Sequence, residues 1–77
     1  MTRTKLSYRE KTELDQLPAR IAADEAESAR LQAAIAGPGF YRESATTIKD
    51  TLARLETVRD ALEKAYWRWD DLDSRSR

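Results

Sequence analysis

The sequence predicts an all-α fold, a two-helix antiparallel intramolecular coiled-coil hairpin. Apolar residues recur at alternating steps of three and four in both halves of the chain, and a Gly-Pro-Gly break separates the halves. Charged residues make up 36% of the chain, which has only two Gly and two Pro, as is typical of long helices with solvated faces. We expect residues 1–77 to form one domain, with helices over about 8–36 and 45–73 and a loop over about 37–44.

The first helix is expected to begin at Tyr8. Ser7 and Glu10 have the spacing of a capping box, in which each side chain accepts a hydrogen bond from the backbone of the other residue. The seam that follows consists of Leu14, Leu17, Ile21, Asp24, Ser28, Leu31 and Ile35. Pro18 removes a backbone donor, but the seam stays in phase across it. The pattern therefore predicts one bent helix rather than two helices.

The second helix is expected to follow a short loop. Gly37 followed by Pro38 is a typical helix stop, and Ser44 is placed to cap the next helix. Its seam consists of Ile48, Thr51, Leu55, Val58, Leu62, Ala65, Trp69 and Leu72. Residues 74–77 are expected to fray.

The two helices have similar predicted lengths and a short connection, so we expect them to pack antiparallel. Aligning the two seams gives a definite register. The pairs that it places opposite each other are Ile35–Ile48, Leu31–Leu52, Ser28–Leu55, Asp24–Arg59, Ile21–Leu62 and Leu14–Trp69. The polar pair within this set is expected to fix the register more than it adds stability.

The composition argues against several classes of function. Cys and His are absent, which removes disulfides, thiolate metal sites and the commonest general base. We expect no enzyme active site, no cofactor and no small-molecule substrate. No apolar run approaches the roughly 18 residues that a membrane span needs, and the start of the chain lacks the apolar stretch of a signal peptide. A cytoplasmic monomer without a membrane partner is expected, with an intermolecular coiled coil as the alternative.

Basic side chains gather where the hairpin is expected to be open. The candidate nucleic-acid-binding residues at that end are Arg3, Lys5, Arg9, Lys11, Lys64 and Arg68. Such a cluster suits phosphate contacts, although surface charges that form pairs along a helix are an equal alternative, and the formal net charge is zero. Trp67 is predicted to point partly outward, where it either packs against the start of the first helix or contacts a partner.

Several segments resemble the C-terminal domain of Uup-type ABC-F ATPases. They are Lys5-Leu6-Ser7-Tyr8-Arg9-Glu10, Leu17-Pro18-Ala19-Arg20-Ile21, Pro38-Gly39-Phe40-Tyr41 and Tyr66-Trp67-Arg68-Trp69, within about residues 5–73. The resemblance implies a fragment that follows two ATP-binding cassettes, so that the parent protein is an ATPase but this chain neither binds nor hydrolyses ATP. It also implies DNA binding through the basic residues of the open end, with the ribosome or RNA as a related partner.

The residues leave a second function open. The hairpin would then be a protein-interaction or structural arm that contacts the ribosome or another protein. Its contacts would come from the helix faces or from the Phe40-Tyr41 tip.

Overall fold

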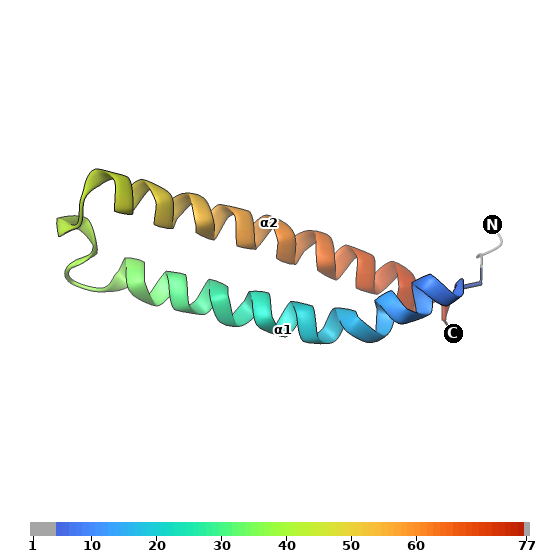
Figure 1. Ribbon diagram of the computed structural model, residues 1–77. Coiled ribbons are helices and arrows are strands. Elements are labelled where there is room, and N and C mark those ends of the chain that lie inside the picture. The colour runs from blue at the N-terminus through green and yellow to red at the C-terminus, as the bar shows by residue number, and fades with distance from the viewer. Residues whose placement is uncertain (1–4, 77) are drawn as a thin grey trace.

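Two long helices packed side by side make up the computed structural model, which describes residues 5–76. Helix α1 spans Tyr8–Ala36, the 3-10 helix η1 spans Phe40–Arg42, and helix α2 spans Ala45–Arg75. The hairpin measures 54 × 20 × 17 Å, and the start of α1 lies beside the end of α2 (Figure 1). The predicted all-α helical hairpin is confirmed. Helix α2 continues to Arg75 rather than fraying after residue 73.

Side-chain caps set the start of each helix. The Ser7 N–H donates to Glu10 Oε1 at 3.0 Å, and the Glu10 N–H donates to Ser7 Oγ at 3.1 Å. This is the predicted capping box, and it satisfies two donors that the first turn would leave unpaired. At the start of α2, the Thr47 N–H donates to Ser44 Oγ at 3.1 Å.

Helix α1 continues through Pro18 and is bent. In Figure 1 its first turns, drawn in blue, are inclined to the rest of the helix. Proline has no N–H to donate to the Leu14 carbonyl, and its ring crowds that carbonyl, so Pro18 permits a bend at this point of the helix. Leu6 and Leu14, which precede the bend, pack against a core cluster that includes Leu72 near the end of α2.

Pro38, and not a left-handed glycine, accounts for the end of α1. Gly37 has φ −67° and ψ 151°, the extended conformation that a residue before proline favours. In the following turn Phe40 is buried, and its ring meets Tyr41 edge to face, with ring centroids 4.9 Å apart. The loop therefore closes with one aromatic ring inside the hairpin and one outside.

The core follows the predicted seams. The buried residues of the two helices are Leu17, Ile21, Ser28, Leu55, Val58, Ala65 and Leu72, and all of them are seam positions. The remaining seam positions are half-buried, except Trp69, which is 36% exposed. Trp69, which the predicted register places opposite Leu14, is therefore not a buried seam position. Leu72, which is 0% exposed, fills the core there instead.

The main polar contact in the middle of the hairpin differs from the predicted one. Among residues 5–76 no ion pair joins Asp24 to Arg59, so that predicted pair is wrong. Arg54 instead donates from Nε and Nη2 to the two carboxylate oxygens of Glu27, at 2.5 and 3.1 Å. The Arg54 hydrogen bond holds the pKa of Glu27 below its ordinary value. Asp24 contributes a weaker attraction to the same guanidinium.

Candidate nucleic-acid interface

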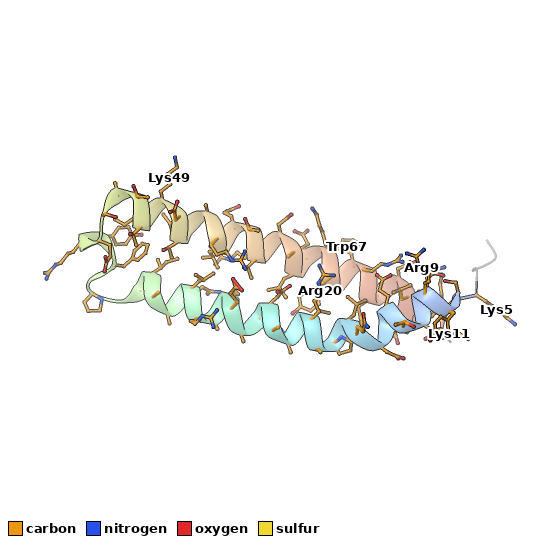
Figure 2. The ribbon with its side chains drawn as sticks, in the orientation of Figure 1. Lys5, Arg9, Lys11, Arg20, Lys49 and Trp67 are labelled. Carbon is orange, nitrogen blue, oxygen red and sulfur yellow. The ribbon has the colours of Figure 1, made fainter. Side chains whose placement is uncertain are left out.

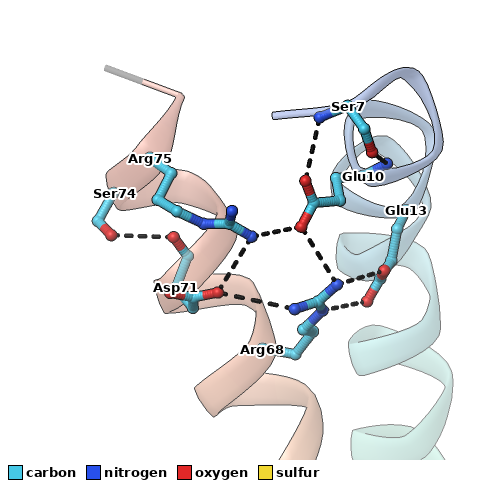
Figure 3. Close-up of polar contacts among 7 residues, drawn as sticks. All are labelled: Ser7, Glu10, Glu13, Arg68, Asp71, Ser74 and Arg75. Carbon is cyan, nitrogen blue, oxygen red and sulfur yellow. Dashed lines mark hydrogen bonds and ion pairs between the residues drawn. The ribbon is translucent and has the colours of Figure 1, made fainter. Parts of the chain in front are cut away.

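A network of charged side chains joins the helices at the open end (Figure 3). Its members are Glu10 and Glu13 of α1 and Arg68, Asp71 and Arg75 of α2. Arg68 donates from Nε and Nη2 to both oxygens of Glu13, at 2.6 and 3.0 Å, which is the forked geometry of a strong guanidinium–carboxylate pair. Arg75 Nη2 lies 2.5 Å from Glu10 Oε2 and 3.3 Å from Asp71 Oδ2.

Glu10 belongs to both the helix cap and the network. Its Oε1 accepts from the Ser7 N–H, while its Oε2 faces Arg75 and lies 3.7 Å from Arg68 Nη2. The Ser7 backbone hydrogen bond, together with Arg75, lowers the pKa of Glu10, and the Arg68 hydrogen bond lowers the pKa of Glu13. Three carboxylates thus face two guanidinium groups, so the charges of Arg68 and Arg75 are already compensated within the fold.

We expect the hairpin to lose stability in acid. The folded-state pKa values of Glu10, Glu13 and Glu27 are lowered, so their contribution is complete above the ordinary carboxyl pKa of 4.5. It is lost as the pH falls through the lower folded values. Urea unfolding followed by circular dichroism at several pH values between neutrality and about pH 3 would measure the loss.

The variant Glu13→Gln should flatten this acid dependence because it removes one of the titrating groups. Glu56→Gln is the matched control, since Glu56 is exposed and makes no ion pair within residues 5–76. Equal pH profiles for Glu13→Gln and the parent chain would show that the network contributes nothing to the acid response.

The five predicted site residues within the described part of the chain do not form one cluster. Arg3 lies outside the described residues. Lys5 and Lys11 line an open groove together with Arg75, whereas Arg9 lines a different groove. Arg9 and Lys11 are two positions apart on α1, so their side chains point about 200° apart around the helix axis.

The last two predicted residues, Lys64 and Arg68, line a groove between the helices together with Arg20. The Lys64 ammonium lies 3.0 Å from Asp60, and Arg68 is held by Glu13. Arg20 makes no ion pair within residues 5–76, and the sequence reasoning missed it. The spacing between Arg9 and Arg20 could have indicated that Arg20 belongs to the site. The two residues are separated by about three turns of α1 and so share one face of the helix.

We use the term groove face for the surface formed by Arg9, Arg20, Lys64 and Arg68. The groove of Arg9 and the groove of Arg20 share Glu13 in their walls, which makes the surface continuous. Tyr8, which is 84% exposed, borders it beside Arg9. Figure 2 marks Arg9 and Arg20 along the hairpin, with Lys5 and Lys11 near the open end and Lys49 toward the loop. The arrangement offers one exposed aromatic ring and two arginines, Arg9 and Arg20, that form no ion pair within residues 5–76, although Glu13 attracts Arg20 at longer range.

Residues 5–76 offer neither a cluster of metal ligands nor a helix that could span a membrane. No group of three or more Asp or Glu side chains within residues 5–76 is placed to hold a metal ion. Neither helix there contains an apolar stretch long enough to cross a bilayer. The groove face is the candidate surface for binding a nucleic acid.

Comparison with known proteins gives a consistent assignment. A family model described as the ABC transporter C-terminal domain matches residues 5–74. The chain is 37% identical over 71 residues to two proteins of Haemophilus influenzae, "ATP-binding protein Uup-like" and "ATP-binding protein Uup". It is 32% identical over 71 residues to "ATP-binding protein Uup" of Escherichia coli. Each match covers 92% of this chain but only 16%, 11% and 11% of the respective relative. No solved structure is significantly similar.

Proposed function

The chain belongs to the ABC transporter C-terminal domain family, as found in Uup-type ABC-F proteins, and we propose that it is a nucleic-acid-binding accessory domain. The relatives are named as ATP-binding proteins, and the chain spans between 11% and 16% of their length. An ATPase parent protein and a cytoplasmic location are parts of the same proposal. Within it, the hairpin supplies contacts with the nucleic acid and takes no part in ATP hydrolysis.

The observation that carries the proposal is the pair of unpaired arginines on the groove face. Arg9 and Arg20 lie about 16 Å apart along α1, given the rise of 1.5 Å per residue. That distance exceeds the spacing of neighbouring phosphates, so the two guanidinium groups can contact different phosphates of one backbone. Tyr8 adds a ring on which an unpaired base can stack.

The charge balance makes the expected binding weak and local. The formal net charge is zero, and Lys64 and Arg68 each already face a carboxylate. Few phosphates can therefore be neutralised at one time. Each phosphate contact should contribute about 0.9 to the slope of log affinity against log salt on duplex DNA, and about 0.7 on a single strand. Because few contacts form, the total slope should be small.

The test compares two double variants in binding to a labelled DNA of about 20 base pairs, between about 50 and 200 mM salt. Arg9→Gln with Arg20→Gln should lower the slope of log affinity against log salt by about 1.8. Arg42→Gln with Lys49→Gln is the matched control, because both residues are exposed and make no ion pair within residues 5–76. A third variant, Lys5→Gln with Lys11→Gln, tests the groove on the other face.

Two results would contradict the proposal. The first is a slope that none of these variants changes. The second is an equal reduction in the control, which would show a response to net charge rather than to the groove face.

The loop tip has less support as a protein-binding site. Phe40 is buried and belongs to the loop's own packing, so of the two tip aromatics only Tyr41, at 70% exposure, is presented to a partner. A single aromatic ring without a surrounding apolar surface is a small anchor compared with the buried clusters that dominate protein interfaces. The groove face is the better-supported site.

A further inference from the structure

The outer face of α2 carries an exposed tryptophan within a row of carboxylates. Residues that alternate in steps of four and three lie on one face of a helix, and here that face is turned away from the seam. Its members are Glu56, Asp60, Glu63, Trp67 and Asp70, which we call the α2 outer stripe. Trp67 is 71% exposed, and Figure 2 marks its position on α2.

The Trp67 side chain makes no hydrogen bond and no ring contact within residues 5–76, and it is largely exposed. Its exposure contradicts packing against the start of α1. Its neighbour Tyr66 does contact α1, because the Tyr66 hydroxyl donates a hydrogen bond to Glu25 Oε2 at 2.7 Å. That hydrogen bond raises the pKa of Tyr66, because a phenolate would lie beside the carboxylate. A tryptophan left in water exposes a large apolar area, and tryptophan is enriched among the residues that dominate binding energies at protein interfaces.

The charge around Trp67 is negative. Glu63 lies about one turn before it and Asp70 about one turn after it, and neither carboxylate makes an ion pair within residues 5–76. Lys64, about one turn before Trp67 on α2, faces Asp60 at 3.0 Å. Asp71 is occupied by Arg68 and Arg75. A nucleic acid approaching Trp67 would bring phosphates against Glu63 and Asp70, so base stacking is disfavoured at this position.

We propose that the α2 outer stripe binds an arginine-rich segment of a partner protein. A guanidinium can lie over the face of Trp67, the aromatic side chain that attracts cations most strongly, while neighbouring arginines form forked pairs with Glu63 and Asp70. Glu63, Trp67 and Asp70 lie outside the groove face, so the proposal stands whether or not the hairpin binds nucleic acid. Asp60 also lines the groove of Arg20 and Lys64, so the two surfaces adjoin there. The hairpin would then carry a cationic surface for phosphates and an anionic one for a basic protein.

The spacing of the stripe suggests the form of the partner segment. Glu63 and Trp67 are about 6 Å apart along the helix axis, and Trp67 and Asp70 about 4.5 Å. Arginines at positions i, i+4 and i+7 of a helical peptide have matching spacings. The probe is therefore a capped, fluorescein-labelled, alanine-based peptide with arginine at those positions. Its control is the same peptide with citrulline in place of arginine, which keeps the shape and removes the charge.

Fluorescence anisotropy of the labelled peptide against the 77-residue chain tests the proposal at low salt. We expect Trp67→Ala to weaken binding about fivefold, the size of one exposed cation–π contact. Glu63→Gln with Asp70→Asn should weaken it at least as much. Glu43→Gln, at an exposed carboxylate near the loop, is the matched control and should leave affinity unchanged. Circular dichroism checks that each variant keeps its helices.

Several outcomes would overturn the proposal. Equal affinity for the arginine and citrulline peptides would remove the charge argument, and unchanged affinity in both stripe variants would remove the site. A loss of DNA affinity in Trp67→Ala with no loss of peptide affinity would assign the tryptophan to a nucleic-acid interface. A sedimentation mass of two chains that returns to one chain in Trp67→Ala would show that a second copy covers the stripe.

Discussion

Leu72→Ala is expected to destabilise the hairpin by about 3 kcal/mol, within the range of roughly 2–5 kcal/mol for a buried leucine replaced by alanine. Leu72 is 0% exposed and packs in one cluster with Leu17, Ile21 and Ala65. Two packed helices have no third layer that could move in to fill the cavity, so the loss should not be reduced by repacking. Urea unfolding followed at the helical circular dichroism band measures it.

The size of the domain makes this loss serious. At roughly 0.05–0.15 kcal/mol per residue, a chain of this length has a total stability of about 4–12 kcal/mol. A loss of about 3 kcal/mol is a large share of the lower values, so Leu72→Ala should be partly unfolded at ambient temperature if the hairpin lies near that limit. Loss of the charged network should accompany unfolding, because Asp71 and Arg75 flank Leu72 on α2.

Leu52→Ala removes the same atoms from an exposed position and serves as the matched control. Its expected cost is about 1 kcal/mol or less, since little apolar area leaves the protein interior. Comparable losses in Leu52→Ala and Leu72→Ala would mean that Leu72 is not a core residue. The stability of the hairpin would then depend on helix propensity rather than on the seam.

Local features of the fold could be predicted from the sequence. The capping box at Ser7 and Glu10 needs only residues three positions apart, and the seam needs only the helical period. Both signals are short-range, so they do not depend on how the helices meet. The stop at Gly37 was predicted from the Gly37-Pro38 pair, and the extended backbone of Gly37 follows from the proline after it.

The charged residues of the candidate site could not be predicted in the same way. Whether Arg68 faces solvent or a carboxylate depends on which residue of α1 lies across from it, and a shift of two residues exchanges Asp15 for Glu13. The aligned seams gave a register close to the observed one, but ion pairs require positions within a few ångströms. Arg68 was therefore predicted as a phosphate contact although Glu13 holds it at 2.6 Å.

Pro18→Ala is expected to stabilise the hairpin by about 1–2 kcal/mol. Alanine restores the N–H that can donate to the Leu14 carbonyl and removes the clash of the ring, a gain of about 3 kcal/mol in a regular helix. Part of it is offset because proline also restricts the unfolded chain, by about 0.4–1 kcal/mol. Pro18 is exposed, so no core contact is lost. Gln16→Ala, at an exposed position on the same helix, is the control.

The sign of this change also tests what imposes the bend in α1. If packing and ion pairs hold the first turns against α2, the bend survives the substitution, the variant is more stable than the parent chain, and the acid dependence through Glu10 and Glu13 remains. If the ring itself imposes the bend, Pro18→Ala straightens the helix and draws Leu6 and Leu14 away from the core cluster. The variant would then be less stable and lose part of its acid dependence. We expect the first result, since Leu6 and Leu14 reach the core while Glu10 and Glu13 reach Arg75 and Arg68, and these contacts together outweigh one missing backbone hydrogen bond.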